Sequence, residues 1–280
     1  MLSISHLYIY PVKSLGGIEL GNACITDRGL QHDRRWMLID EENRFLTQRE
    51  LPRMALLKTA INEKELQVFE KGNEVDKFSI NLYPVEAEIM NVQVWEDTCE
   101  ALRISDKADQ WFSEKLNLNC RLVYMPESTR RKVDEDYSLH ADITGFSDAF
   151  PLLMIGQSSL DDLNSRLEKP LPMNRFRPNI VFTGGNPYEE DTMKHFNING
   201  IDFFSVKPCA RCVITTTDQE TGITAKEPLK TLSKYRTGNN KVYFGQNILY
   251  NGEGKINTGD AITVVQTKPY LQLNENLSNT

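Results

Sequence analysis

Short stretches in which apolar and polar residues alternate recur along most of the chain and predict β-strands with one buried face. The first stretch covers residues 2–10 and is ended by Pro11. Others with this pattern, or rich in β-branched and aromatic residues, cover residues 23–26, 32–40, 45–49, 54–61, 66–69, 78–80, 88–95, 120–124, 180–182, 242–247 and 262–265. The pattern therefore predicts a mainly β protein with a few helices, of the α+β class.

Helical spacing, with apolar residues three or four positions apart, is confined to a few segments. It predicts helices over residues 105–116 and 158–169, the second ending before Pro170, and a short helix within residues 226–236. Candidate N-caps are Ser105 or Asp106 for the first helix and Ser158 or Ser159 for the second.

A charged stretch, residues 126–137, separates two β-rich halves and is predicted to be a solvated connector. We place a domain boundary at its start. The predicted units are residues 1–125, residues 126–266 and a polar, flexible tail at residues 267–280.

Composition limits the class of protein. The chain has 280 residues, of which 40% are hydrophobic and 25% charged, as in an ordinary soluble globular protein. A net charge of −7 argues against a nucleic-acid binder. No apolar run approaches the roughly 20 residues of a membrane span, and no signal peptide is visible. Five cysteines without a disulfide pattern fit a reducing compartment, so we expect the protein to be cytoplasmic.

The stretch from Lys207 to Asp218 is chemically the most distinctive. Cys209 and Cys212 lie beside Lys207 and Arg211, and nearby positive charge favours the thiolate, the form that attacks or binds metal. The β-branched run after Cys212 predicts a strand.

Four interpretations of the two cysteines remain open from the residues alone. A structural zinc site would need further Cys or His ligands at suitable spacing, which the other cysteines and the four histidines do not supply. A thioredoxin-type redox pair would open a helix, whereas this pair precedes a predicted strand. The other two are a pair of buried, unreactive thiols, and a single thiolate that binds a transition metal whose remaining ligands belong to a cofactor.

The stretch also resembles the molybdenum-binding segment of the MOSC family. The resemblance lies in Cys-x-Arg-Cys at residues 209–212, the β-branched run, and Thr-x-Asp-x-x-Thr-Gly at residues 216–222. It is strongest to the branch that contains the mitochondrial amidoxime reducing component and its bacterial relatives. There the second cysteine ligates molybdenum, which implies that Cys212 is the metal ligand and the catalytic residue here. The role of Cys209 stays open.

Four further motifs resemble the same family in the same order. They are Tyr-Pro-Val-Lys-Ser at residues 10–14, Asp-Arg-x-Trp at 33–36, Phe-Ser-Asp at 146–148 and Phe-Arg-Pro-Asn at 176–179. Together with the cysteine motif they imply these cofactor-binding residues: Lys13, Ser14, Arg34, Ser147, Asp148, Arg177, Asn179, Arg211 and Cys212. From the residues alone, a lysine in a turn such as Lys13 is usually just solvated, and Arg34 shares one face of a predicted strand with Trp36 and Leu38.

The resemblance implies an N-terminal β-barrel-like domain and a C-terminal MOSC β-barrel with a molybdopterin cofactor between them. It implies a reductase of amidoximes, hydroxylamines and N-hydroxylated bases that is independent of pyridoxal phosphate. We expect no iron–sulfur cluster in this chain, so a separate flavin or iron–sulfur protein would supply electrons. The alternative is a molybdenum-cofactor carrier or a sulfur-transfer protein that holds a persulfide on Cys209 or Cys212. A zinc-stabilised binding module is a third, non-enzymatic possibility.

Overall fold

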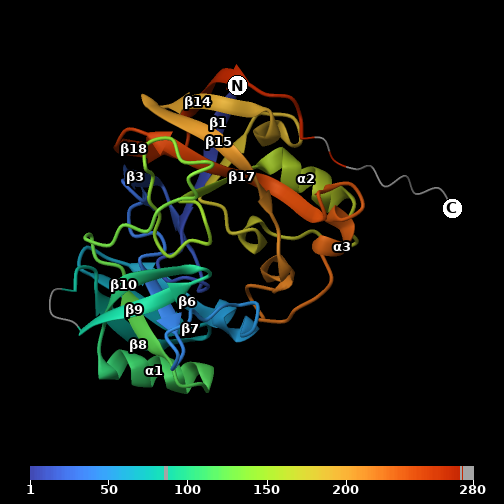
Figure 1. Ribbon diagram of the computed structural model, residues 1–280. Coiled ribbons are helices and arrows are strands. Elements are labelled where there is room, and N and C mark those ends of the chain that lie inside the picture. The colour runs from blue at the N-terminus through green and yellow to red at the C-terminus, as the bar shows by residue number, and fades with distance from the viewer. Residues whose placement is uncertain (85–87, 272, 274–280) are drawn as a thin grey trace.

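The computed structural model describes residues 1–84, 88–271 and 273. These residues form two sheet-rich units, with the strands β1, β14, β15 and β17 in one and β6–β10 with helix α1 in the other (Figure 1). Strands make up 43% of the structure, which confirms the predicted mainly β class. The predicted tail, residues 267–280, lies largely outside the described residues, although Lys268 N still donates a hydrogen bond to Thr192 O at 2.8 Å.

The first unit is built around a barrel of seven strands that closes where β12 pairs with β17. In barrel order the strands are β12 (Leu152–Gly156), β13 (Ile180–Thr183), β1 (Leu2–Ile9), β19 (Ala261–Thr267), β14 (Met193–Ile198), β15 (Ile201–Ala210) and β17 (Lys241–Asn251). Strands β2 (Ile18–Leu20) and β16 (Thr237–Gly238) extend it at β1 and β17. A small sheet of β18 (Gly254–Asn257), β3 (Asn22–Thr26) and β4 (Gly29–Leu30) packs against the same core.

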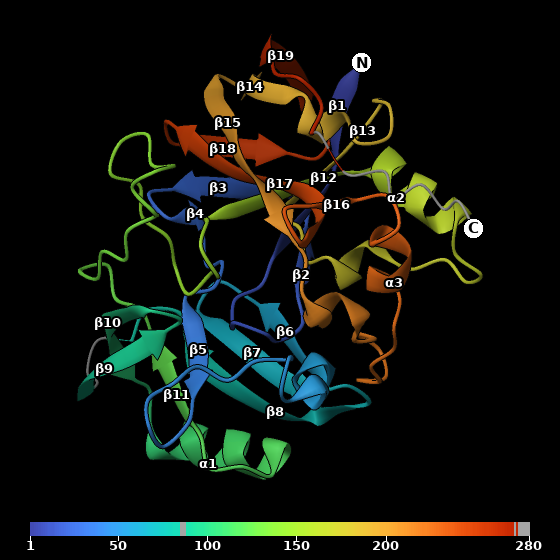
Figure 2. The same ribbon diagram turned by 45° about the vertical axis from the view of Figure 1, so that its right-hand side comes forward.

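The second unit contains two further sheets. One is formed by β5 (Trp36–Ile39), β11 (Arg121–Tyr124), β10 (Asp97–Arg103) and β9 (Glu88–Val94), and the other by β6 (Leu57–Ile61), β7 (Glu65–Glu70) and β8 (Asn73–Asn81). Helix α1 (Asp106–Leu116) lies below them in Figure 2 and inserts the fully buried Phe112 into their shared core.

The N-terminal strand does not stay with the unit that follows it. β1 pairs with β13 and β19 inside the barrel, and β3 pairs with β18. Strands from both sides of the predicted boundary between residues 125 and 126 thus share hydrogen bonds. The boundary itself stays a prediction. After β1 the chain touches the second unit's core at Val12 and Leu15, on either side of Lys13 and Ser14, and then returns to the barrel side in β2 and β3.

The three predicted helices are found at the predicted positions, but the residues at which they begin and end do not always match the prediction. Ser105 caps α1, accepting a hydrogen bond from Ala108 N at 3.2 Å, as predicted. Helix α2 is shorter than predicted (Gln157–Ser165), and its N-cap is Gly156. The serine caps predicted for α2 are wrong, because the Ser159 hydroxyl points to buried Glu190 and donates to it at 2.8 Å. Helix α3 (Leu229–Leu232) lies within its predicted range.

Four predicted strands differ in the structure: one is replaced by a 3-10 helix, two are shortened, and the one predicted over residues 45–49 is reduced to a bridge between Phe45 and Ile39 followed by a turn. Residues 213–216, predicted as a strand, form the 3-10 helix η4 (Val213–Thr216). The hydroxyls of Thr215 and Thr216 donate to the carbonyls of Cys212 and Val213 at 3.0 and 2.7 Å, and such local bonds compete with strand pairing. The predicted strand therefore does not argue against a redox pair, because a 3-10 helix follows Cys212.

Two of the corrections shorten the strands at their N-terminal ends. The predicted strand at residues 54–61 begins with the 3-10 helix η1 (Pro52–Leu56). The strand predicted over residues 32–40 starts only at Trp36, and all four residues of β5 are buried. Arg34 therefore lies in a turn before the strand and does not share a strand face with Trp36. Two further 3-10 helices, η2 (Met173–Arg175) and η3 (Glu189–Asp191), complete the described elements.

None of the helices in the described part of the chain is long and apolar enough to cross a membrane. The helices that flank the barrel are short and pack on its outside, with α3 beside β17.

We expect one buried ion pair to be essential for holding β17 in place. Arg236 Nη2 donates to Asp191 Oδ2 at 2.6 Å, and Gln246 Nε2 of β17 donates to Asp191 Oδ1 at 2.7 Å. The side chains of the ion pair are 6% and 1% exposed. Asp191→Ala would leave a buried guanidinium unpaired and should lower the free energy of unfolding in urea by about 3 kcal/mol.

The matched control is Glu42→Ala, which removes an exposed partner of Arg44. Its effect should stay within about 0.5 kcal/mol. Equal losses for the two variants would contradict the importance assigned to the buried pair.

Candidate functional site

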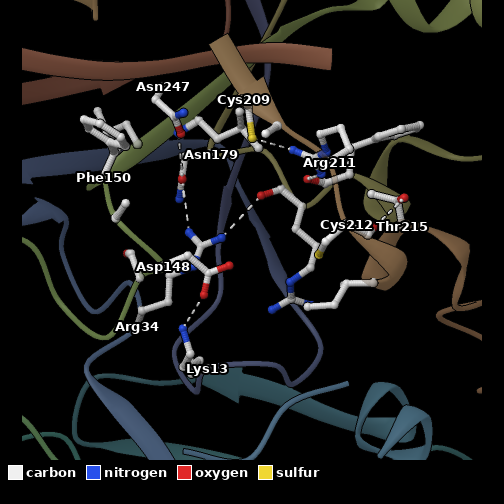
Figure 3. A pocket seen from close by; sticks show the side chains of 18 of the residues that line it. Lys13, Arg34, Asp148, Phe150, Asn179, Cys209, Arg211, Cys212, Thr215 and Asn247 are labelled. Carbon is white, nitrogen blue, oxygen red and sulfur yellow. Dashed lines mark hydrogen bonds and ion pairs between the residues drawn. The ribbon is translucent and has the colours of Figure 1, made fainter. Parts of the chain in front are cut away.

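A cavity of about 140 Å³ lies where the chain passes between the two units. All of the predicted cofactor-binding residues line it: Lys13, Ser14, Arg34, Ser147, Asp148, Arg177, Asn179, Arg211 and Cys212. Figure 3 shows Lys13, Arg34 and Asp148 facing the segment that carries Cys209, Arg211 and Cys212. The structure thus brings together residues spread over 200 positions of sequence, while the role of each stays a prediction.

The backbone is held in an unfavourable conformation at three of these residues. Ser14, Arg34 and Arg177 have positive φ values of 66°, 46° and 55°. Residues with a Cβ seldom adopt this region, and such conformations persist where the surrounding structure enforces them, often at functional sites. In this conformation the three polar side chains point from loops into one cavity. A regular strand at these positions would direct them elsewhere.

Lys13 is buried and almost fully hydrogen-bonded. Its Nζ donates to Phe146 O at 2.8 Å and to Asp148 Oδ1 at 2.6 Å, which leaves one N–H for a ligand. Burial lowers the pKa of Lys13 to about 8, although the neighbouring Asp148 carboxylate acts in the opposite direction. The interpretation of Lys13 as a solvated lysine in a turn is therefore wrong.

Arg34 and Arg177 are linked to each other and stack on one aromatic ring. Arg34 Nη1 donates to Asp33 Oδ2 at 2.6 Å and to Asn179 Oδ1 at 3.1 Å, and Arg34 Nη2 donates to Arg177 O at 3.3 Å. Both guanidinium groups lie over the ring of buried Tyr10, at 4.5 and 4.2 Å from its centroid. Tyr10 therefore helps to orient two cations that would otherwise repel each other.

The cysteine segment continues directly from a barrel strand. β15 ends at Ala210 after an irregularity in its pairing with β17, and Cys212 then precedes η4. Arg211 Nη1 donates to Cys209 Sγ at 3.0 Å, and Nη2 donates to Phe176 O. Cys212 is half-buried and lines the cavity, so it is not an unreactive core thiol.

Arg49 is a candidate site residue that the sequence reasoning missed. Arg49 Nη2 donates to Asp148 Oδ2 at 2.9 Å, its guanidinium lies 4.5 Å from the ring centroid of Trp95, and it is near enough to the Cys212 sulfur for the two to interact electrostatically. Trp95 Nε1 donates to Asp148 at 3.3 Å. Nothing in the sequence pattern of residues 45–49 distinguishes Arg49 from a solvated arginine, because its partners lie far away in the chain.

Asp148 is the counter-charge that these cations share. Partial desolvation opposes ionisation of this side chain, which is 53% exposed, but the charges of Lys13 and Arg49 outweigh that cost and hold the pKa of Asp148 well below its usual range. Asp148 therefore remains an anion that accepts hydrogen bonds and does not act as a proton donor at neutral pH.

Several buried donors next to the cavity have no partner among the described residues. They include Arg177 Nη1 and Arg211 Nε. Unpaired buried donors are costly, and they suit a ligand rich in acceptor oxygen atoms, such as a phosphate group or a pterin edge. The residues present therefore fit the predicted cofactor.

Protein ligands alone do not make a metal site here. Among the described residues, no group of three or more His, Cys, Asp and Glu side chains is placed to hold a metal ion. A metal bound at Cys212 would need its other ligands from a cofactor, and a four-ligand zinc site is not formed by these residues.

Comparison with known proteins agrees with this geometry. Residues 1–119 match the profile described as the MOSC N-terminal beta barrel domain, and residues 142–263 match the MOSC domain. The chain is 32% identical to mitochondrial amidoxime-reducing component 1 of Mus musculus over 93% of this chain and 81% of that protein. It is 34% identical to mitochondrial amidoxime reducing component 2 of Rattus norvegicus over 84% of this chain and 72% of that protein. It is also 32% identical to molybdenum cofactor sulfurase of Oryza sativa subsp. japonica, over 90% of this chain but only 33% of that longer protein.

Anion binding should depend on the protonation of Lys13. Because the pKa of Lys13 is about 8, raising the pH from about 7.5 to about 9 removes a positive charge from the cavity. The affinity of cofactor-free protein for phenyl phosphate, measured by calorimetry, should fall on the order of tenfold over this range. Lys13→Arg keeps its charge and should bind equally well at both pH values. The same decrease in this variant would contradict the assignment to Lys13.

The proximity of Arg49 should control the reactivity of Cys212. Arg49→Gln removes a cation beside the sulfur, so alkylation of Cys212 by iodoacetamide at neutral pH should slow several-fold. The exposed Cys24 in the same protein is an internal control and should react at an unchanged rate, as measured by peptide mass spectrometry. Arg53→Gln, which alters an exposed arginine paired with Glu70, should leave both rates unchanged. An unchanged Cys212 rate in Arg49→Gln would show that the guanidinium does not influence the sulfur.

Proposed function

The chain belongs to the MOSC family, and from this premise we propose that it is a molybdenum-cofactor-dependent reductase of N-hydroxylated compounds. The observation that carries the proposal is the shared cavity. It joins a half-buried cysteine to cations from both units, with hydrogen-bond donors left unpaired beside it. The similarity to amidoxime-reducing components over most of both chains supports the same activity.

The residues divide into two groups by chemistry. Lys13, Ser14, Arg34 and Arg177 present charged and neutral donors to the phosphate and pterin edge of the cofactor. Cys212 offers its thiolate to molybdenum, and Arg211, Ser147 and Asn179 shape the wall around it. When bound, the cofactor supplies the two-electron chemistry that removes oxygen from an N–O bond, and the protein binds and orients it.

Asp148 and Arg49 would act on the substrate side. Because Asp148 is held ionised by its cationic neighbours, it can accept a hydrogen bond from the amino group of an amidoxime and orient it. Arg49 keeps this carboxylate in place and lies beside the Cys212 sulfur. These roles follow from contacts within this chain and do not depend on cofactor geometry.

Electrons would come from a separate flavin or iron–sulfur protein. Val213, directly after Cys212, is 51% exposed and is a point at which such a donor can approach the site. All five cysteines are free, which fits a reducing compartment, and we propose the cytoplasm as the location.

The second candidate function is a cofactor carrier or sulfur-transfer protein. One observation that favours it is the 32% identity to molybdenum cofactor sulfurase over 90% of this chain. The other is that Cys209 lines the same cavity as Cys212. Such a protein would carry cyanide-labile sulfur without molybdenum, whereas a reductase purified from a molybdenum-replete host would contain about one molybdenum per chain.

Substitution of Cys212, together with metal analysis, tests the reductase. Cys212→Ser should reduce benzamidoxime with an artificial electron donor about a hundredfold more slowly than native protein, because the thiolate that would bind molybdenum is lost. Cys24→Ser, at an exposed position outside the cavity, is the matched control and should retain native activity. Full activity of Cys212→Ser, or zinc without molybdenum in the native protein, would refute the reductase.

A further inference from the structure

Arg131 lies in the charged connector at residues 126–137, but its side chain is not solvated. Only 4% of this side chain is exposed, against 62% for that of its neighbour Arg130. A buried guanidinium needs acceptors for most of its five N–H groups, because each unpaired donor is costly. The prediction of a solvated connector is therefore wrong at this residue, and its hydrogen-bond partners indicate what it does there.

Three of these partners are backbone carbonyl groups of the loop that carries Asp148. Arg131 Nη1 donates to Gly145 O at 3.0 Å and to Ser147 O at 2.7 Å, and Nη2 donates to Asp148 O at 3.1 Å. A planar guanidinium has donors in fixed directions and can hold three carbonyl groups at once. A lysine at this position would offer a single nitrogen on a flexible stem and could not replace it.

The other side of the loop is held by residues of the cavity. Phe146 N donates to Arg34 O at 2.7 Å, and Phe146 O accepts from Lys13 Nζ at 2.8 Å. A Cβ atom on Gly145 would lie 2.7 Å from Arg34 O, so the two chain segments are in direct contact. The loop is therefore held from two sides, and the carboxylate of Asp148 at its end faces Lys13 (Figure 3).

The fourth partner of Arg131 connects the loop to the hairpin of β9 and β10. Arg131 Nε donates to Asp97 Oδ2 at 2.7 Å. Asp97 is the first residue of β10, and Trp95, two positions earlier, donates from Nε1 to Asp148 Oδ1 at 3.3 Å. One guanidinium thus fixes both the backbone of Asp148 and the hairpin that supplies a donor to its carboxylate.

We propose that Arg131 is a positioning residue of the cavity, which holds the backbone of residues 145–148 so that the Asp148 carboxylate stays between Lys13 and Arg49. Arg131 does not itself line the cavity and acts through Asp148. The proposal rests on contacts within the chain and not on the reductase activity. Failure of the tests below would leave the proposed function untouched, and loss of the proposed function would leave Arg131 in this role.

The pKa of Lys13 reports the position of Asp148. Burial lowers this pKa, the Asp148 carboxylate raises it, and the charges of Arg131 and Arg49 lower it further. Lys13 stays buried when the loop loosens, because its ammonium also lies 4.9 Å from the ring centroid of Phe45. The pKa of Lys13, about 8, should therefore fall when Asp148 is no longer fixed beside it.

The first test compares amide hydrogen exchange in the native full chain and in Arg131→Lys, which keeps the charge but loses the planar set of donors. Exchange in residues 143–148 should rise on the order of tenfold, because Thr144 N and Phe146 N are bonded only while the loop is fixed. Exchange in the hairpin of β14 and β15 reports unfolding of the barrel and should rise less. Arg130→Lys, at the exposed neighbouring position, is the matched control and should change neither.

Asp97→Ala is a milder variant, because the Asp97 side chain is 49% exposed and its loss removes one partner of Arg131 and leaves the three carbonyl groups. It should raise the exchange of residues 143–148 about threefold. Equal rises in the loop and the barrel would show that Arg131 only stabilises the fold. No rise in either variant would show that the loop does not depend on Arg131. Either result overturns the proposal.

The second test measures the pKa of Lys13 itself, which a purely structural role would not change. NMR of protein labelled with ¹³C at the lysine ε carbon gives this pKa, and Lys13→Arg identifies the signal. Arg131→Lys should lower the pKa by about one unit, and Asp148→Asn should lower it by at least as much. Arg130→Lys should leave it at about 8.

The double variant shows whether Arg131 acts through Asp148. In an Asp148→Asn background, Arg131→Lys should have no further effect on the pKa of Lys13, because the carboxylate that it positions is gone. A pKa that Arg131→Lys does not lower in the native background, or lowers equally in both backgrounds, would contradict the proposal.

Discussion

Compensation of closely spaced positive charges is the constraint on which the candidate site depends. Lys13, Arg34 and Arg177 line one partly closed cavity, and Arg49 binds Asp148 at its edge, so the repulsion among these cations is poorly screened. The structure offsets it with two carboxylates, Asp148 between Lys13 and Arg49 and Asp33 beside Arg34. Aromatic rings contribute further, since Tyr10 lies under two guanidinium groups and Trp95 under a third.

The compensation of positive charge leaves some hydrogen-bond donors unpaired, which suits the binding of an acidic ligand. The carboxylates hold the cations in place but leave individual donors unpaired, among them Arg177 Nη1 and Arg211 Nε. An acidic ligand completes the charge balance, so the cost of assembling the cations is recovered when it binds. The positive φ values at Ser14, Arg34 and Arg177 point the same way, because strained backbone is kept where a function requires it.

The site also depends on how the two units are joined. β1 is part of the barrel, and the residues just after it line the cavity where the chain touches the second unit's core. Across the junction, Gln48 Nε2 donates to Ser14 O at 2.7 Å, and Gln219 Nε2 donates to Gln48 Oε1 at 2.9 Å. Lys58 adds a bond to Gln219 O. Separation of the units would therefore disrupt the cavity.

Local interactions explain what could be predicted from the sequence and what could not. Alternation predicted most strands, and Ser105 was found as a cap, since both depend on neighbouring residues. The motifs nominated residues that do converge on one cavity, because motif order preserves their places in the fold. Propensity failed at residues 213–216, where threonine hydroxyls bond back to the preceding carbonyls, and at the start of α2, where Ser159 bonds a distant glutamate instead of capping. The amino-acid sequence alone thus determined the strand pattern and the types of chemical group available. The roles of Arg49, Trp95 and Tyr10 were decided only by the tertiary structure, because their hydrogen bonds and stacking contacts are to residues remote in sequence, which no local pattern encodes.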